Sequence, residues 1–132
     1  MTSRICVWDR EQDHHTIRNN FIEESYEAVE AIDRDDPVLL QEELGDVLLQ
    51  VVFHARMEEE AGRFSFSDVC DGICKKLVYR HPHVFGDTAV ENSGQVLENW
   101  DRLKKAEKHQ ETAASTLQAV SKALPALVRA LE

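Results

Sequence analysis

The chain has 132 residues, 42% of them hydrophobic and 30% charged, which fits one domain with its own core and excludes general disorder. Its formal net charge of −10 argues against a nucleic-acid partner, because phosphate backbones are bound by basic surfaces. No apolar run approaches the roughly 20 residues that span a bilayer. With no visible signal peptide and three cysteines that form no C-x-x-C pair, we predict a cytoplasmic protein with no membrane partner.

The first predicted element is an irregular polar segment over residues 1–15, anchored to the rest of the protein by Ile5 and Trp8. A helix is predicted from about residue 16 to residue 32, because apolar residues recur there at helical spacing. Its expected buried stripe consists of Ile17, Phe21, Ala28, Val29 and Ile32.

A second helix is predicted from Pro37 to about Ala61. Asp36 suits its N-cap, Pro37 suits its first position, and Gly62 suits its C-terminal stop. Gly45, in its interior, costs about 1 kcal/mol of helix propensity, which either a close approach to the backbone or simple helix–helix contact would explain. The expected buried stripe consists of Leu40, Leu44, Val47, Leu48, Val51 and Ala55.

Two further helices are predicted, over residues 66–79 and 94–108, with a structured loop at "HPHVFGD" between them. The expected cap residues are Ser65 or Ser67 for the first of these helices and Ser93 for the second. Four helices with short connections predict an all-α fold that resembles a four-helix bundle. The predicted domain covers 1–110, and 111–132 is predicted to be a linker and the start of a further amphipathic helix.

Acidic residues flank the apolar stripes of the first two long helices. On a helical wheel, Glu24 falls at the edge of its stripe with Glu27 one step farther out, whereas Glu23 points to the opposite side. Glu43 and Asp46 lie together on one flank of the second stripe. Each pair is spaced by three residues and shares a helix face, so antiparallel packing would let the two pairs converge.

Four converging carboxylates repel one another unless they are protonated or neutralised. A divalent cation would offset that charge, and oxygen ligands favour Mg²⁺, Mn²⁺ or Ca²⁺ over Zn²⁺. One such pair would be read as a solvated helix shoulder, but two pairs beside the core on consecutive helices favour a cation site. A di-iron centre is disfavoured, because only Glu11-x-x-His14 matches the Glu-x-x-His motif and it precedes the first helix.

Magnesium commonly joins carboxylates to substrate phosphates, so basic side chains are expected near such a site. Lys76 and Arg80 are four residues apart on the third long helix, and Lys104 lies one turn beyond Trp100 on the fourth. Trp100 could stack on a base or could belong to the helical core. The chain has no G-x-x-x-x-G-K phosphate loop, so a triphosphate would have to be bound by metal and side chains.

These residues carry a family resemblance. "EESYE" followed by "EELGDVLLQVVFHARM" resembles the E-E-x-x-E…E-x-x-D signature of the MazG family of nucleoside triphosphate pyrophosphohydrolases. The resemblance continues through "GRFSFSDV", "KKLVYRHPHVFGD" and "VLENWDRLKKAEK" and reaches from "WDREQ" to "ALPALVRA". A wider all-α superfamily shares the carboxylate signature, and the addition of "RHPHVF" is specific for MazG.

The resemblance implies an all-α homodimer that uses Mg²⁺, with Mn²⁺ as a substitute, to hydrolyse a nucleoside triphosphate between its α and β phosphates. The products would be a nucleoside monophosphate and pyrophosphate. The implied catalytic base is Glu27 or Glu43. The implied metal ligands are Glu24, Glu27, Glu43 and Asp46, and the implied substrate contacts are Lys76, Arg80, Trp100 and Lys104.

The chain also departs from the family pattern. It has "CVWD" where the family usually has Cys-Pro-Trp-Asp, and "QDHH" where the family has Gln-Thr-His. Many relatives carry two such domains. These departures keep open a second hypothesis, a catalytically weak helical dimerisation or regulatory module that binds nucleotide or a protein partner.

Overall fold

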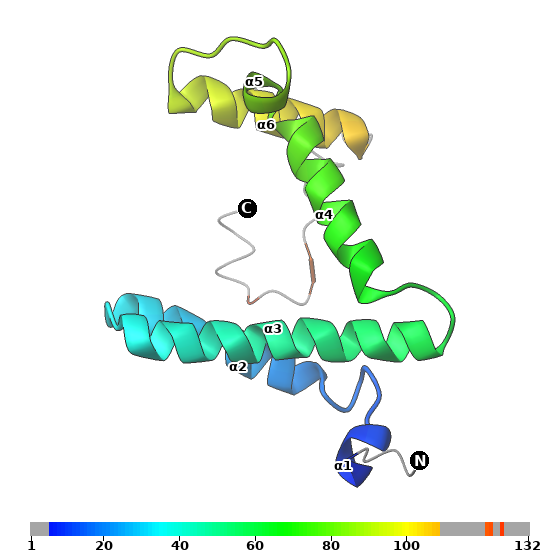
Figure 1. The fold of residues 1–132 in the computed structure, drawn as a ribbon. Coiled ribbons are helices and arrows are strands. Elements are labelled where there is room, and N and C mark those ends of the chain that lie inside the picture. The colour runs from blue at the N-terminus through cyan, green and yellow to red at the C-terminus, as the bar shows by residue number, and fades with distance from the viewer. Residues whose placement is uncertain (1–5, 109–120, 123–124, 126–132) are drawn as a thin grey trace. The chain divides into compact units, whose positions relative to one another are not determined.

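The structure, a computed structural model, describes residues 6–108, 121–122 and 125, and this part of the chain is helical with no strand (Figure 1). The all-α prediction is therefore confirmed. The predicted linker and helix over 111–132 lie almost wholly outside the described residues. The helices in the described part are α1 (Val7–Arg10), α2 (Arg18–Asp33), α3 (Pro37–Glu60), α4 (Phe66–Arg80), α5 (Pro82–Phe85) and α6 (Ser93–Glu107).

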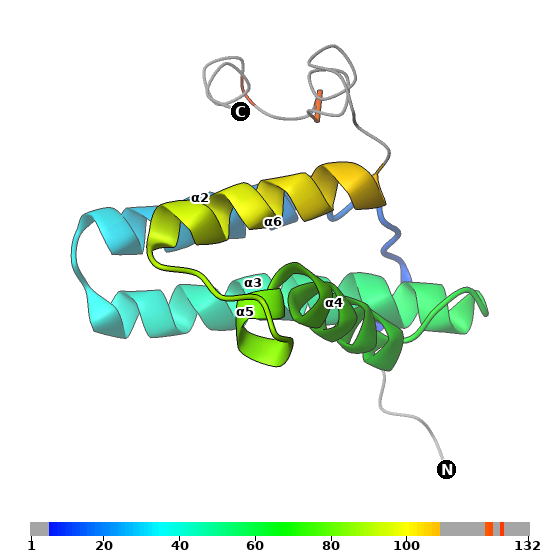
Figure 2. The same cartoon turned by 90° about the horizontal axis from the view of Figure 1, so that it is seen from above.

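The chain divides into two compact units, Met1–Asp71 and Gly72–Glu132. In the first unit, α2 and α3 run antiparallel and side by side, joined by a tight turn (Figures 1 and 2). The second unit contains most of α4 together with α5 and α6. Within the described residues, no helix is both long enough and apolar enough to cross a membrane.

The turn between α2 and α3 follows from its sequence. Asp35 adopts a φ of 52°, a left-handed conformation that aspartate tolerates better than most residues. The Asp36 carboxylate then accepts hydrogen bonds from the backbone N–H groups of Val38 and Leu39, at 3.1 and 3.0 Å. This is the predicted N-cap of α3, with Pro37 at the first helical position, so the start of α3 is confirmed.

The buried part of the contact between α2 and α3 consists chiefly of small side chains. Ile17, Ala28 and Ala55 are buried as predicted, and Ala31, which belongs to neither predicted stripe, has no exposed surface. The predicted burial of four larger members of the stripes was wrong, because the faces that meet are rotated toward the alanines. The exposed members are Val29, Ile32, Leu44 and Leu48.

Three local predictions need correction. Residues 7–10 form the short helix α1 instead of an irregular segment, and the predicted anchor Trp8 places its ring edge-on to Phe53 with centroids 6.5 Å apart. The "HPHVFGD" loop contains α5, because Pro82 suits the first position of a helix. Asn92, not Ser93, caps α6 by accepting a hydrogen bond from the backbone N–H of Gln95 at 3.0 Å.

Candidate functional site

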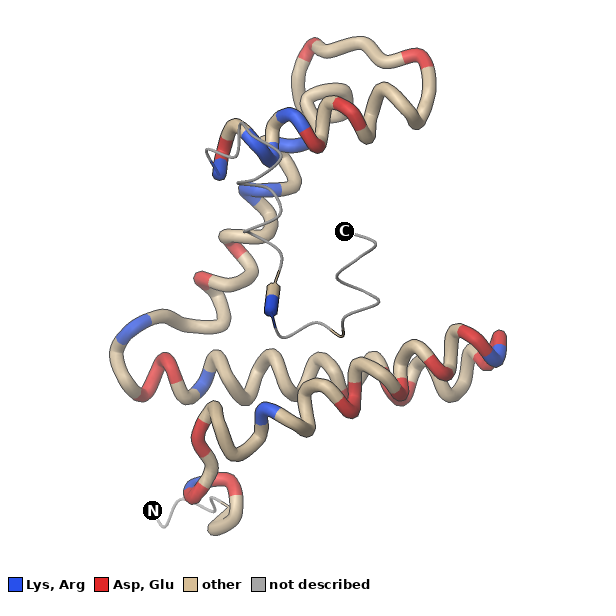
Figure 3. Tube along the Cα trace, turned by 180° about the vertical axis from the view of Figure 1, so that it is seen from behind, with Lys and Arg blue, Asp and Glu red and all other residues tan. Residues whose placement is uncertain are grey.

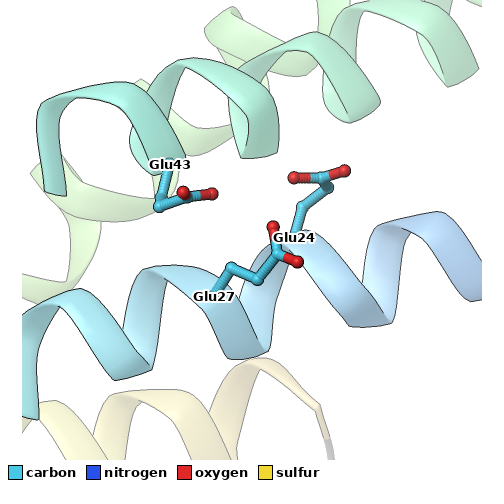
Figure 4. Close-up of side chains that lie close together, drawn as sticks. All are labelled: Glu24, Glu27 and Glu43. Atoms are coloured by element: carbon cyan, nitrogen blue, oxygen red, sulfur yellow. The ribbon is translucent and has the colours of Figure 1, made fainter. Parts of the chain in front are cut away.

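Three of the four predicted acidic residues come together between α2 and α3. Glu24, Glu27 and Glu43 each offer a carboxylate oxygen, and these three oxygens lie within 4.8 Å of one another. Figure 4 shows Glu24 and Glu27 on α2 facing Glu43 on α3 across the space between the helices. We call these three residues the carboxylate cluster.

The helical period explains why α2 directs an acid toward α3. Glu24, Ala28 and Ala31 are spaced by four and three residues, so they share one face, and that face is the buried one. Glu23 is exposed, as its place on the wheel predicts. On α3, Glu43 is 8% exposed, so the prediction of a core-edge acid understated its burial.

Burial and mutual repulsion raise the pKa of two members of the cluster. The pKa of Glu43 is raised first by burial and then by the charges of Glu27 and Asp46. The pKa of Glu24 is raised for the same reasons, with burial again the largest cause. The two residues therefore hold their negative charges in an environment that disfavours them, and a cation would relieve this repulsion.

The fourth predicted ligand, Asp46, lies beside the cluster but is not one of the three residues with converging oxygens. Its charge nevertheless contributes to the raised pKa values of both Glu24 and Glu43. Asp46 therefore lies close enough to the cluster for its charge to act on both residues.

One oxygen in the cluster, Glu43 Oε2, is buried without a hydrogen-bond partner among the described residues. A buried carboxylate oxygen without a partner is costly, and folded proteins rarely keep one without a functional reason. A site made only of carboxylate oxygens fits a hard dication such as Mg²⁺ or Mn²⁺, which prefers oxygen ligands.

The face of α3 that holds Glu43 also carries a polar residue that sequence reasoning missed. Gln50 lies seven residues after Glu43 on the same helix face, and its Oε1 atom is likewise buried without a partner in the described part of the chain. The seven-residue spacing was the available signal. Gly45, between Glu43 and Asp46, has no atom within 4 Å of the position its Cβ would occupy, so its backbone is open to approach.

The predicted substrate contacts lie in the second unit, where Lys and Arg residues gather on α4 and α6 (Figure 3). Arg80 is only 4% exposed, and its guanidinium donates to Glu107 Oε2 from Nε at 3.0 Å and from a terminal nitrogen at 2.7 Å. Its Cζ atom lies 5.0 Å from the centre of the Trp100 ring, and Lys104 Nζ lies 5.3 Å from it. Lys76 is exposed on α4.

The structure thus brings together Arg80, Trp100 and Lys104, and Arg80 is already engaged by an acid that the sequence analysis did not select. Glu107 follows Lys104 by three residues on α6, which was the available signal for a shared face. The Arg80 guanidinium is fixed by this ion pair and by the ring of Trp100, and the Lys104 ammonium lies beside the same ring.

Comparisons with known proteins agree with the helical fold and with the family resemblance. Residues 12–85 match the family described as the MazG nucleotide pyrophosphohydrolase domain. A nucleoside triphosphate pyrophosphohydrolase of Escherichia coli K12 is 49% identical over 125 residues, covering 95% of this chain and 48% of that protein. A nucleoside triphosphate pyrophosphohydrolase/pyrophosphatase MazG of Thermotoga maritima is 43% identical over 122 residues, covering 92% of this chain and 46% of that protein.

The chain belongs to the MazG family. It spans about half the length of these two curated relatives. A crystal structure of a MazG-related protein from Thermotoga maritima superposes with a TM-score of 0.64 at 22% identity, covering 77% of this chain and 89% of that one. This superposition independently supports the all-α fold.

Proposed function

We propose that the protein hydrolyses nucleoside triphosphates between the α and β phosphates, releasing a nucleoside monophosphate and pyrophosphate in a Mg²⁺-dependent reaction. The observation that carries the proposal is the carboxylate cluster, with its buried and partnerless Glu43 oxygen. The activity for which the Escherichia coli and Thermotoga maritima relatives are named supports the reaction class.

In this proposal the carboxylate cluster and Asp46 hold Mg²⁺, with Mn²⁺ as a substitute. When bound, the cation would lower the pKa of the attacking water and offset charge on the leaving pyrophosphate. Either Glu27 or Glu43 would accept the proton of the water. The raised pKa of Glu43 supports that residue as a base, because a carboxylate whose pKa lies nearer to neutral accepts a proton more readily.

A triphosphate carries more negative charge than one dication neutralises, so the proposal also needs basic side chains. We assign this role to the predicted substrate contacts Lys76, Arg80 and Lys104, with Trp100 available to stack on the base. The cationic groups already beside the Trp100 ring support this assignment, because an indole flanked by positive charge suits a polyanion that carries an aromatic base.

The test is product analysis of nucleoside triphosphates incubated with the protein and Mg²⁺, using phosphorus NMR to separate pyrophosphate from orthophosphate. Pyrophosphate should be formed only with the cation present and should stop on chelation. Glu43→Gln should abolish the reaction, whereas Glu23→Gln, on the exposed side of α2, should retain it. Full turnover by Glu43→Gln would overturn the proposal.

The exposed apolar side chains of α2 and α3 favour assembly with a second copy, and we propose a homodimer. Tyr26 and Val29 on α2, and Leu44, Leu48 and Leu49 on α3, are each between 49% and 55% exposed. Several half-exposed apolar side chains on two adjacent helices are typical of an interface. Sedimentation of the purified protein should give twice the mass of the chain, and a monomer at micromolar concentration would contradict this proposal.

The same surface also keeps the second hypothesis open, a helical module that binds nucleotide or a protein partner without turnover. This module would bind a nucleoside triphosphate with Mg²⁺ but release no pyrophosphate. The product analysis therefore separates the two functions. The cytoplasmic location stays a prediction.

A further inference from the structure

A second group of ionisable side chains lies in the first unit and takes no part in the carboxylate cluster. His14 Nδ1 lies 2.6 Å from His54 Nδ1, and the two rings are stacked with their planes 5° apart. His14 Nε2 lies 2.5 Å from Glu58 Oε1. Glu58 in turn accepts hydrogen bonds from Arg63 Nε and from a terminal Arg63 nitrogen, at 2.5 and 2.7 Å.

These contacts fix how many protons the two imidazoles can hold. Arg63 donates to Glu58, so the Glu58 carboxylate is an acceptor and His14 Nε2 must carry a hydrogen. Two ring nitrogens 2.6 Å apart can share one hydrogen but not two. Either His14 is an imidazolium that donates to a neutral His54, or both rings are neutral and His54 donates to His14. The doubly protonated state would place two N–H groups head to head.

We propose that His14 and His54 form an acid-sensitive clamp that holds the N-terminal segment, residues 6–17, on α3. Protonation of both imidazoles breaks the contact between their Nδ1 atoms, and the segment is then held on α3 by the bond from His14 to Glu58 and by the ring contact of Trp8 with Phe53. Within the described residues, two side-chain hydrogen bonds join this segment to α3, the clamp and the bond from His14 to Glu58. Loss of the clamp therefore loosens α1 and the turn before α2 against α3.

Few titratable groups surround the His14–His54 contact apart from Glu58. From α2 the neighbour of His54 is Phe21, with ring centroids 5.7 Å apart, and it does not titrate. Beside His14 in the same segment are Asp13 and His15, and from the start of the next loop comes Arg63. The Asp13 carboxylate accepts hydrogen bonds from the backbone N–H groups of His15 and Thr16, so its contacts lie within its own turn.

Burial, followed by the charge of His14, lowers the pKa of His54 below its usual 6.5. A lowered pKa in the clamped state means that the clamp is fully formed above the ordinary histidine pKa and is lost as the pH falls toward the lowered value. Hydrogen bonds from Arg63 chiefly, and from His14, lower the pKa of Glu58 to about 2. Glu58 therefore stays ionised through the range in which the imidazoles titrate.

Trp8 provides a reporter, because it belongs to the clamped segment and contacts Phe53, the residue before His54. In a Trp100→Phe background without divalent cation, Trp8 emission should shift to the red as the pH falls from about 8 to about 5. His54→Gln should remove this transition while keeping the emission at pH 8, since glutamine hydrogen-bonds without titrating. His15→Gln, the exposed neighbour outside the clamp, should leave the transition in place.

Direct NMR observation of the histidine nitrogens in the unsubstituted protein makes the test independent of the folding of any variant. One hydrogen shared between His14 and His54 should be seen at neutral pH and lost in acid. A Trp8 emission that does not change with pH, a transition that survives His54→Gln, or imidazoles that titrate independently would each overturn the proposal. The readouts need no nucleotide or cation, so their failure is distinct from failure of the proposed function.

Discussion

Replacing Ala31 by leucine should push α2 away from α3 and so lower the affinity of the carboxylate cluster for a cation. Ala31 has no exposed surface and lies on the same helix face as Glu24. Leucine adds three carbon atoms for which the contact has no room. Overpacking of this kind costs about 1–3 kcal/mol, and each kcal/mol lowers Tm by about 4 °C in a chain of this length. We therefore expect Tm to fall by at least about 4 °C.

The assay is calorimetric unfolding without cation, followed by titration with Mg²⁺. Ala106→Leu on α6 is the matched control, because that alanine is exposed and leucine has nearly the same helix propensity. The control should change neither Tm nor cation affinity, whereas Ala31→Leu should reduce both. An Ala31→Leu protein with unchanged Tm and unchanged affinity would show that α2 and α3 do not meet through Ala31.

Three further predictions concern α3 and the cluster. Gly45→Ala should stabilise the cation-free protein by about 1 kcal/mol in thermal unfolding, because the added methyl group meets open space in a helix interior; a loss of stability would contradict the open surroundings of Gly45. Asp36→Ala should destabilise it by about 1 kcal/mol, since two backbone N–H groups lose their acceptor, and an unchanged Tm would argue against the cap. Because the pKa of Glu43 is raised in the folded protein, its charge destabilises the fold above that pKa and the penalty disappears as the pH falls through it. Without cation, Glu43→Gln should accordingly have a higher Tm than the unsubstituted protein at pH 7, and the difference should shrink in acid. A lower Tm at pH 7 would show that the Glu43 charge does not destabilise the fold.

Local signals in the sequence were sufficient for much of the helical framework. The Asp36–Pro37 start of α3 depends on backbone chemistry within a few residues, and the structure confirms it. Gly62 ends the same helix region with a φ of 72°, which glycine adopts readily. The three-residue spacing of Glu24 and Glu27 placed both on one face of α2, and antiparallel packing brought Glu43 to them.

The sequence was less informative about which faces meet. Val29 and Ile32 are more hydrophobic than Ala31, so the periodic pattern predicted that they would be buried. In the structure Ala31 is buried instead, because a small side chain lets the two helices approach closely. The ion pair of Arg80 with Glu107 joins residues 27 positions apart on different helices, and a local sequence pattern does not predict which helices meet. The same holds for His14 and His54, which are 40 positions apart. Long-range polar contacts depend on the tertiary fold rather than on helical period.

The central claim is that Glu24, Glu27 and Glu43 lie together because they hold a divalent cation. The most direct measurement is binding of Mn²⁺, followed by electron paramagnetic resonance, to the unsubstituted protein and to the Glu43→Gln and Glu23→Gln variants in the absence of nucleotide. The affinity should fall at least about tenfold for Glu43→Gln, because a charged carboxylate becomes a neutral amide, and should be unchanged for Glu23→Gln. Equal affinity in all three proteins would contradict this claim.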